Sequence, residues 1–256
     1  MNLKALFLTT TLILGVVKLG SARHGNPVES AGRAPVLLEL FTSEGCSSCP
    51  SADRLLQKLD RKQPVDGADL IVLSEHVDYW NHLGWVDPYS SAEFSKRQQD
   101  YASLLGSEVY TPQLVIDGRR QAVGSDQPAI ENAIHDSLRS PKIPVAVSAK
   151  READEVEVHL DVAPVEGRAA ASVYLVLAAD EARSHVMRGE NAGRELEHVA
   201  VVQSLVKVAD LSRGSALQKD VRAAFKPLVP GGNLRVVVFV QDRGSRRIIG
   251  VGQNRL

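Results

Sequence analysis

The sequence predicts an α/β domain at residues 34–140, followed by a β-rich, sandwich-like region at residues 143–256. Three observations support this division. In the first part, short apolar runs of strand length alternate with segments whose apolar residues have helical spacing. In the second part, apolar and polar residues alternate one by one, which is typical of strands with one buried face. Two prolines, Pro141 and Pro144, lie between the parts, and strands that alternate with helices imply a layered α/β architecture.

The first region is expected to contain three strands and three helices. Each expected strand is a short apolar run, and each expected helix repeats apolar residues three and four positions apart. Gly106 is expected to end the second helix, because glycine readily adopts the left-handed backbone found at helix ends. Asp117 and Gly118 are expected to form a tight turn after the third strand. The strands are expected at 36–41, 70–73 and 114–116, and the helices at 50–59, 91–105 and 128–138.

The second region is expected to be an antiparallel β-sandwich. Residues 155–162 place Val156 and Val158 on one face and Glu157 and His159 on the other, which predicts a half-buried strand. Several such strands separated by turns are most simply accommodated in two packed sheets. The segment 215–225 fits a helix and a strand equally well. Further strands are expected at 172–179, 199–208, 234–241 and 248–251.

Residues 1–22 have the pattern of a secretory signal peptide. Lys4 precedes an apolar run at 5–17, and small residues lead up to a cleavage site after Ala22. The run is shorter than the ~20 apolar residues that a membrane span needs, so an uncleaved anchor is the less favoured alternative. We therefore expect an exported protein, periplasmic or secreted, with no stable membrane span after cleavage. Export would place its cysteines where disulfides persist.

The composition excludes several classes of protein. Apolar residues make up 44% of the 256 residues and charged residues 24%, a balance typical of globular proteins. The chain has 30 basic and 31 acidic residues, and a protein that neutralises phosphates would carry a basic excess, so no nucleic-acid partner is expected. Only 2 cysteines are present, which excludes four-cysteine zinc sites and scaffolds with several disulfides.

These two cysteines form a Cys-x-x-Cys motif, Cys46-Ser47-Ser48-Cys49-Pro50, between an expected strand and an expected helix. The unpaired N–H groups and the dipole at a helix N-terminus stabilise a thiolate there. Cys46 is therefore expected to be the exposed attacking thiol and Cys49 the resolving thiol, with exchange through a mixed disulfide on Cys46. The cofactor would be this redox-active disulfide itself, with no organic cofactor and no resident metal.

A second motif lies at the entrance of the third expected strand, where Thr111 precedes Pro112. A proline at this place is typical of a cis peptide bond. A strand, a Cys-x-x-Cys helix, a Thr-Pro about 60 residues later and a closing strand–turn–helix together resemble the thioredoxin-like superfamily over residues 34–140. The resemblance implies that Pro112 is cis and faces the cysteine pair.

A narrower resemblance rests on four segments, LELFTSEGCSSCP, HVDYWNHLGWVDP, RQQDYA and VYTPQLVIDG. Together they resemble the secreted domain-of-unknown-function 1223 family, which has no settled activity. This resemblance implies that Cys46 and Cys49 are the redox-site residues and that Pro112 is the cis-proline. The chain departs from ordinary thioredoxins because Ser47-Ser48 replaces their Gly-Pro spacer, so their reduction potential and partners do not transfer.

Other residues are candidates for supporting roles. Glu39 lies inside an apolar strand, and the resemblance implies a buried carboxylate that moves a proton for the resolving cysteine. The alternative is a carboxylate that faces solvent or pairs with a base. His76, Asp78, Trp80 and Trp85 follow a strand at the sheet edge where open α/β sheets bind ligands, so we expect them to line a substrate groove. The alternative is a small core that caps the domain.

The sequence therefore predicts an exported thiol–disulfide oxidoreductase-like protein that acts on protein or small thiol and disulfide substrates. The direction of electron flow stays open, because Glu44 would raise the pKa of the Cys46 thiol while the helix dipole would lower it. One alternative is a copper metallochaperone, in which His76 or His82 would join the two thiolates on Cu(I). Another is a non-catalytic binding protein with a structural disulfide.

Overall fold

The computed structural model describes residues 32–152, 154–165, 170–225 and 232–256. The predicted signal peptide at residues 1–22 lies outside the described residues. Among the helices of the described ranges, none combines the length and the apolar character that crossing a bilayer requires.

The first region contains every strand and helix that the sequence predicts, with one additional strand, β4. The helix α1 has a proline in its first turn, and α2 ends at Gly106, whose φ of 65° is left-handed. Strand β4, with the sequence RQAV, has no apolar run and only exposed or half-buried residues, so the pattern did not reveal it. The elements are β1 (Ala34–Thr42), α1 (Cys49–Lys62), β2 (Ala68–His76), the short 3-10 helix η1 (Asn81–Leu83), α2 (Ala92–Leu105), β3 (Gln113–Ile116), β4 (Arg120–Val123) and α3 (Gln127–Leu138).

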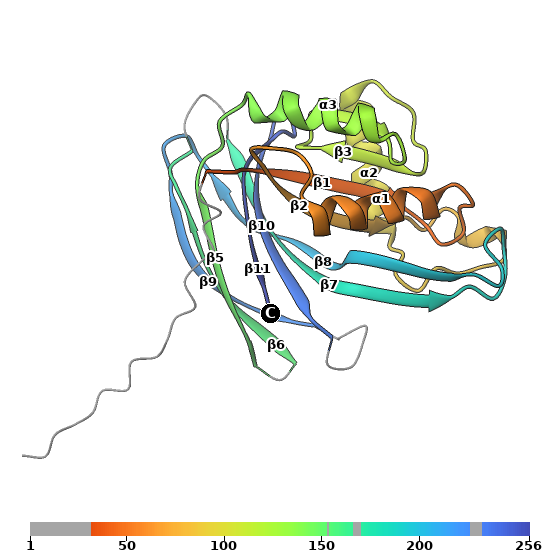
Figure 1. The fold of residues 1–256 in the computed structure, drawn as a ribbon. Coiled ribbons are helices and arrows are strands. Elements are labelled where there is room, and N and C mark those ends of the chain that lie inside the picture. The colour runs from red at the N-terminus through yellow and green to blue at the C-terminus, as the bar shows by residue number, and fades with distance from the viewer. Residues whose placement is uncertain (1–31, 153, 166–169, 226–231) are drawn as a thin grey trace, which may run out of the picture.

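The second region is formed by strands alone within its described residues. Strand β6 has the predicted bounds, and the ambiguous segment at 215–225 forms strand β9. Strands β7 and β8, of 15 and 17 residues, are longer than predicted and form a hairpin that extends beyond the other strands (Figure 1). Strand β5 was not predicted. The strands are β5 (Val145–Glu152), β6 (Glu155–Val162), β7 (Ala171–His185), β8 (Glu195–Leu211), β9 (Leu217–Ala224), β10 (Leu234–Asp242) and β11 (Ile248–Arg255).

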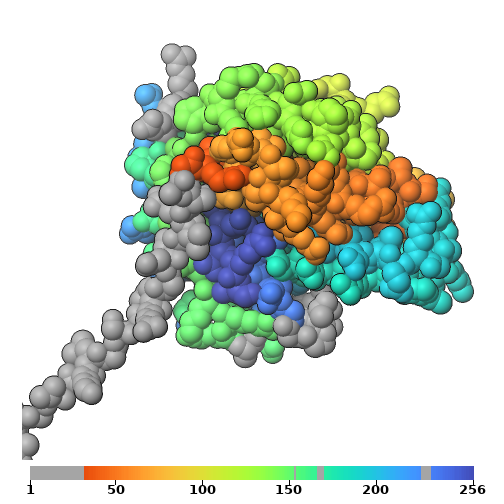
Figure 2. Space-filling model, in the orientation of Figure 1, coloured from red at the N-terminus to blue at the C-terminus, as the bar shows by residue number. Residues whose placement is uncertain are grey.

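Strands of both regions belong to one large sheet. Its strand order is β11-β10-β7-β8-β2-β1-β3-β4. Strands β1 and β2 are parallel, and β3 and β4 are antiparallel to their neighbours. The junction is narrow, because β2 and β8 pair at Ser74 and Val201 alone. Figure 2 shows the first region, in red to green, in direct contact with the blue strands of the second. The fold is therefore a mixed, strand-rich α/β arrangement.

Successive side chains of β1 point to opposite faces of the sheet and so belong to two different cores. Leu38 and Leu40 pack with the apolar faces of α1 and α3. Phe41 points to the opposite face, where it packs with Tyr101 of α2. Helices therefore cover this half of the sheet on both faces. In the second region, strands β5, β6 and β9 form a separate sheet whose apolar face shares one core with β7 and β10.

A buried arginine ties α1 to the second region. Arg235 of β10 is fully buried, and its guanidinium contacts Asp60 of α1 at 2.8 Å and Asp180 of β7 at 2.5 Å. Arg255 of β11 adds a second contact with Asp60 at 2.8 Å. Because a buried carboxylate needs a compensating charge, these contacts fix the position of α1 and of the cysteine motif at its start.

We expect the substitution Arg235→Met to lower the free energy of unfolding by about 3 kcal/mol, because it leaves the buried Asp60 with one cation fewer. Urea denaturation measures this change. The control is Arg61→Met, which removes an ion pair with Glu181 whose side chains are 53% and 60% exposed. The control should change stability by less than about 1 kcal/mol. Equal losses in the two variants would contradict the role given to Arg235.

Candidate redox site

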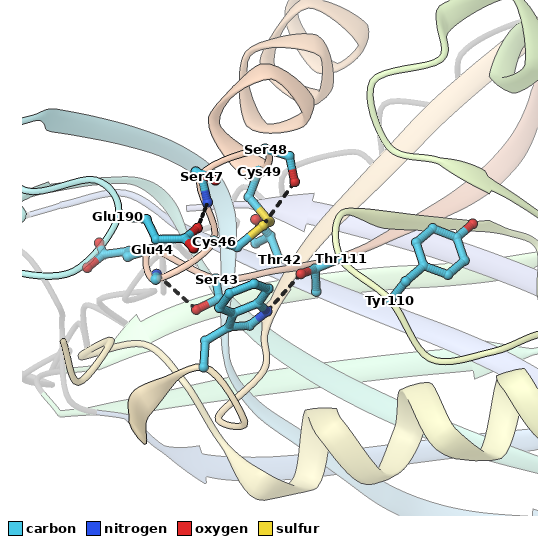
Figure 3. Close-up of a disulfide and its surroundings, with 12 residues drawn as sticks. Thr42, Ser43, Glu44, Cys46, Ser47, Ser48, Cys49, Tyr110, Thr111 and Glu190 are labelled. Atoms are coloured by element: carbon cyan, nitrogen blue, oxygen red, sulfur yellow. Dashed lines mark hydrogen bonds between the residues drawn. A yellow bond between two sulfur atoms is a disulfide. The ribbon is translucent and has the colours of Figure 1, made fainter. Parts of the chain in front are cut away.

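Cys46 and Cys49 form a disulfide at the start of α1, with their Cα atoms 5.4 Å apart (Figure 3). Strand β1 ends at Thr42, a short turn follows, and Cys49 is the first helical residue. The backbone N–H of Cys49 donates to the Cys46 carbonyl at 3.2 Å, which closes the turn. The placement of the motif between a strand and a helix is as predicted.

The disulfide is buried, which corrects the expectation that Cys46 is exposed. Cys46 is 1% exposed and Cys49 0%, while Ser47 and Ser48 between them are exposed. Trp80 packs against the turn, because a Cβ added to Gly45 would lie 3.0 Å from the Trp80 Cβ. The turn therefore presents its two serines to solvent and keeps its sulfur atoms inside.

The Thr111–Pro112 peptide bond is cis, as predicted. The Thr111 hydroxyl oxygen accepts a hydrogen bond from the Trp80 indole N–H at 2.8 Å. A Cβ added to Gly124 would lie 2.9 Å from the Ala52 Cβ and 3.1 Å from the Pro112 Cβ, so Pro112 packs close to the first turns of α1. Figure 3 shows Thr111 beside the disulfide. The structure thus brings the two sequence motifs together.

Two of the residues expected to line a groove, His76 and Trp85, are instead connected by hydrogen bonds to the cysteine turn. His76 is fully buried, and its Nδ1 lies 2.7 Å from Asp87. Asp87 also accepts the backbone N–H of Glu44 at 2.9 Å. Trp85 is half-buried, and its indole N–H donates to the Glu44 carboxylate at 2.8 Å. The Nδ1 atom of His76 and the indole N–H of Trp85 are therefore bonded within the protein, as in the alternative of a small capping core, while the His76 Nε2 atom is buried without a hydrogen-bond partner among the described residues.

Two predicted carboxylates, Glu39 and Asp78, are both bonded to α2. Glu39 is buried and accepts hydrogen bonds from Arg97 and from Tyr101, each at 2.7 Å. Asp78 accepts a hydrogen bond from the Ser95 hydroxyl at 2.5 Å. Helix α2 covers the face of β1 opposite to α1. Glu39 is therefore paired with a base on the far side of the sheet and does not lie beside the resolving cysteine.

The carboxylate nearest in sequence to the resolving cysteine on its own helix is Asp53. It follows Cys49 by four residues, so the two side chains are neighbours on one face of α1. Asp53 is buried, and it accepts a hydrogen bond from the Thr42 hydroxyl at 3.0 Å. His198 of β8 lies with Nδ1 3.7 Å from Asp53 and Nε2 3.4 Å from Glu44.

The carboxylates of Asp53 and Glu44 favour the protonated form of the His198 imidazole. Burial alone would lower the pKa of the imidazole, but the neighbouring Asp53 and Glu44 carboxylates outweigh burial and raise its pKa to about 10. From the sequence, the negative charge of Glu44 is expected to disfavour a Cys46 thiolate. The neighbouring protonated His198 offsets part of that charge.

The tip of the β7–β8 hairpin also contacts the cysteine turn. The Asn191 side-chain amide donates to the carbonyls of Glu44 and Cys46 at 2.8 and 2.9 Å. The Glu190 carboxylate accepts the Ser47 backbone N–H at 2.9 Å. No local pattern in the sequence connects the turn to Glu190, Asn191 and His198, which lie more than 140 residues away along the chain. Asp53 was also not predicted, although it follows Cys49 by only four residues.

A metal centre was one alternative for these side chains. Within the part of the chain that the structure describes, no group of three or more His, Cys, Asp or Glu side chains is arranged to hold a metal ion. Of the two histidines considered as copper ligands, His76 is buried and His82 is exposed on η1.

Comparison with known proteins identifies relatives of this chain. The family model described as Protein of unknown function (DUF1223) matches residues 37–241. A crystal structure of a protein from Agrobacterium tumefaciens is 31% identical, with a TM-score of 0.63, over 85% of this chain and 92% of that chain. The sporulation control protein Spo0M of Bacillus subtilis is 16% identical over 45% of this chain and 48% of that chain, and its TM-score of 0.29 is too low to indicate a shared fold. No match is found among the curated proteins.

We expect His198→Gln to lower the free energy of unfolding by about 3 kcal/mol at pH 6, because Asp53 and Glu44 lose their shared cation. The folded pKa of about 10 lies above the unfolded value of 6.5. The stabilisation is therefore complete below about pH 6.5 and is lost as the pH rises through about 10.

Urea unfolding at pH 6, 8 and 10 measures this loss as a shrinking difference between the wild type and His198→Gln. His185→Gln is the matched control, since His185 pairs with Glu195 on the exposed surface of the same hairpin. A difference that stays constant between pH 6 and 10 would show that His198 is not a buried cation.

Proposed function

Because this chain belongs to the family described as Protein of unknown function (DUF1223), whose description assigns no reaction, we propose a function from the site itself. The protein is an exported thiol–disulfide oxidoreductase. Its Cys46–Cys49 pair exchanges electrons with the thiols and disulfides of protein or small-molecule substrates. The observation that carries the proposal is a disulfide at the start of α1, next to a cis Thr111–Pro112 bond.

The topology around the disulfide supports a thioredoxin-like assignment for residues 34–140. Parallel strands β1 and β2 are connected through α1, and the antiparallel pair β3–β4 is followed by α3. The cysteine motif lies where β1 leads into α1, and the cis-proline lies just before β3. This order matches the strand, helix and closing strand–turn–helix on which the sequence resemblance rests.

Two observations support export. The N-terminal pattern at residues 1–22 is that of a signal peptide, and a disulfide persists in the oxidising compartments outside the cytosol. We therefore place the protein in the periplasm or in the extracellular medium.

The proposed reaction consists of two thiol–disulfide exchange steps. A substrate thiolate attacks Cys46 Sγ, a new S–S bond forms, and the Cys46–Cys49 bond breaks with its electron pair left on Cys49 Sγ, which takes up a proton. A second substrate thiolate then attacks the substrate sulfur of the mixed disulfide and releases Cys46 as a thiolate. The substrate gains a disulfide and the protein gains two thiols, and the same steps reversed reduce a substrate disulfide.

Asp53 is the group that fits the proton transfer at Cys49. Cys49 is 0% exposed, so bulk water does not reach its sulfur directly. Asp53 lies one helical turn away, and the Thr42 hydroxyl fixes one of its carboxylate oxygens. The Asp53 carboxylate lies 3.7 Å from His198 Nδ1. It would accept the Cys49 proton when the protein reduces a substrate disulfide, and would return a proton to Cys49 Sγ in the opposite direction. We assign to Asp53 the role that the sequence resemblance gave to Glu39.

The burial of Cys46 favours a second candidate, in which the disulfide is only a structural clip. The reduction potential distinguishes the two functions. Structural disulfides lie below about −300 mV, and exchange-active ones lie higher. Equilibration of the purified protein with thiol buffers of known potential measures it. We expect a value above about −300 mV, and a lower one would favour the structural clip.

The variant Cys49→Ser should capture substrate proteins as mixed disulfides on Cys46, because no resolving thiol remains to release them. Non-reducing electrophoresis of the exported fraction, followed by mass spectrometry, detects the complexes. The matched control is Cys46→Ser, which keeps one thiol at the less accessible position. Capture by neither variant, or equal capture by both, would contradict the assignment of Cys46 as the nucleophile.

We expect Asp53→Asn to slow disulfide exchange by about 100-fold near pH 7, since it removes the proton acceptor next to Cys49. Insulin reduction followed across a range of pH measures the rate and its profile. Asp53→Glu keeps a carboxyl group and should restore part of the rate. A rate and a pH profile in Asp53→Asn that match the wild type would rule out this role for the carboxylate.

A further inference from the structure

The loop that joins β7 and β8, residues 186–194, contacts the backbone of the cysteine turn although it belongs to the second region. We call it the hairpin lid. We infer that the hairpin lid closes over the oxidised cysteine pair, and that reduction of the disulfide to the Cys46 thiolate releases it. This inference rests on the proposed function, because it describes how a substrate gains access to the same site.

Asn191 is the residue that holds the hairpin lid closed. It is fully buried, whereas its neighbours Glu190 and Ala192 are exposed. Its amide nitrogen donates to the carbonyls of Glu44 and Cys46, and its amide oxygen accepts from Arg194 at 3.0 Å. All three hydrogen bonds therefore point at the turn or stay within the lid. Loss of this side chain would leave two buried carbonyls with fewer donors.

Glu190 makes the closed state depend on redox state. The hydrogen bonds from Ser47 lower the pKa of Glu190, so its carboxylate is ionised at neutral pH. It accepts the Ser47 N–H, one residue from Cys46, at the helix end that would also stabilise a Cys46 thiolate. The disulfide is neutral and tolerates this carboxylate. A thiolate at Cys46 would repel it, because both anions depend on the same positive end of α1.

Internal hydrogen bonds allow the hairpin lid to move as one rigid unit. Hydrogen bonds link Val186 N to Arg194 O at 3.0 Å and Gly193 N to Val186 O at 2.7 Å, so the loop is closed on itself. Its contacts with the first region include the bonds of Glu190 and Asn191 and the approach of Gly189 to Trp85, where an added Cβ would lie 3.4 Å from the Trp85 Cβ. None of these contacts belongs to the β7–β8 ladder, so opening would leave the ladder intact.

The first test is the rate at which dithiothreitol reduces the disulfide in the purified exported protein at pH 7. Asn191→Ala should raise the second-order rate constant about tenfold, because two hydrogen bonds that favour the closed state are lost. Glu195→Gln is the matched control, since this exposed carboxylate of the same hairpin pairs with His185. We expect the control rate to equal that of the wild type.

The second test needs no variant at Asn191 and stands even if Asn191→Ala fails to fold. Hydrogen exchange of the Ser47 N–H is measured in the oxidised and the dithiothreitol-reduced wild type. We expect exchange at least about tenfold faster in the reduced protein, because the acceptor Glu190 has moved away. In Glu190→Gln the difference between the two redox states should shrink, since a neutral amide is not repelled by the thiolate.

An unchanged reduction rate in a folded Asn191→Ala variant, or equal protection of the Ser47 N–H in both redox states, would overturn the inference. Neither measurement uses a protein substrate. Failure of Cys49→Ser to capture substrates would therefore count against the proposed function alone, while these two results would still decide whether the hairpin lid responds to redox state.

Discussion

The burial of the Glu44 carboxylate is the constraint on which the site depends. Glu44 lies two residues before Cys46 and is fully buried, and a buried carboxylate is tolerated only where charges and donors compensate it. Trp85 supplies one hydrogen bond, Ser184 of β7 another, and His198 of β8 the positive charge. Two of these three partners come from the second region. The cysteine turn is therefore complete only when the β7–β8 hairpin is docked against it.

The second region therefore supplies side chains that the cysteine turn of the first region needs. The large sheet joins the two at the single pair of Ser74 and Val201, which by itself is a weak connection. The buried Arg235 fixes α1 at one end, and the contacts of Asn191 fix the cysteine turn at the other. The second region thus contacts α1 near its end, at Asp60, and the turn that precedes its start, at the Glu44 carbonyl. A domain that ended near residue 140 would leave Glu44 without its cation.

Features with local signals could be predicted from the sequence, and features that depend on distant contacts could not. Helix α1, strand β6 and the cis bond at Pro112 each follow from a spacing or a residue type within a few positions. Glu39 was misplaced because β1 is buried on both faces, so its apolar run does not show which face α1 covers. Asp53 could have been found from its four-residue spacing to Cys49. His198 and Asn191 could not, since no pattern relates them to residues 44–46.

The charges around the cysteine turn bear on the direction of electron flow. The turn is surrounded by the carboxylates of Glu44, Asp53 and Glu190, against one imidazolium on His198. The N-terminus of α1 favours a thiolate on Cys46, but this excess of negative charge opposes it. A strong oxidant of this chemistry owes its high potential to a stabilised reduced form. Here the reduced form is the one that meets repulsion, which favours the disulfide. In the proposed function, release of the hairpin lid would carry Glu190 away and relieve part of that repulsion, so the opening of the site would be coupled to disulfide exchange.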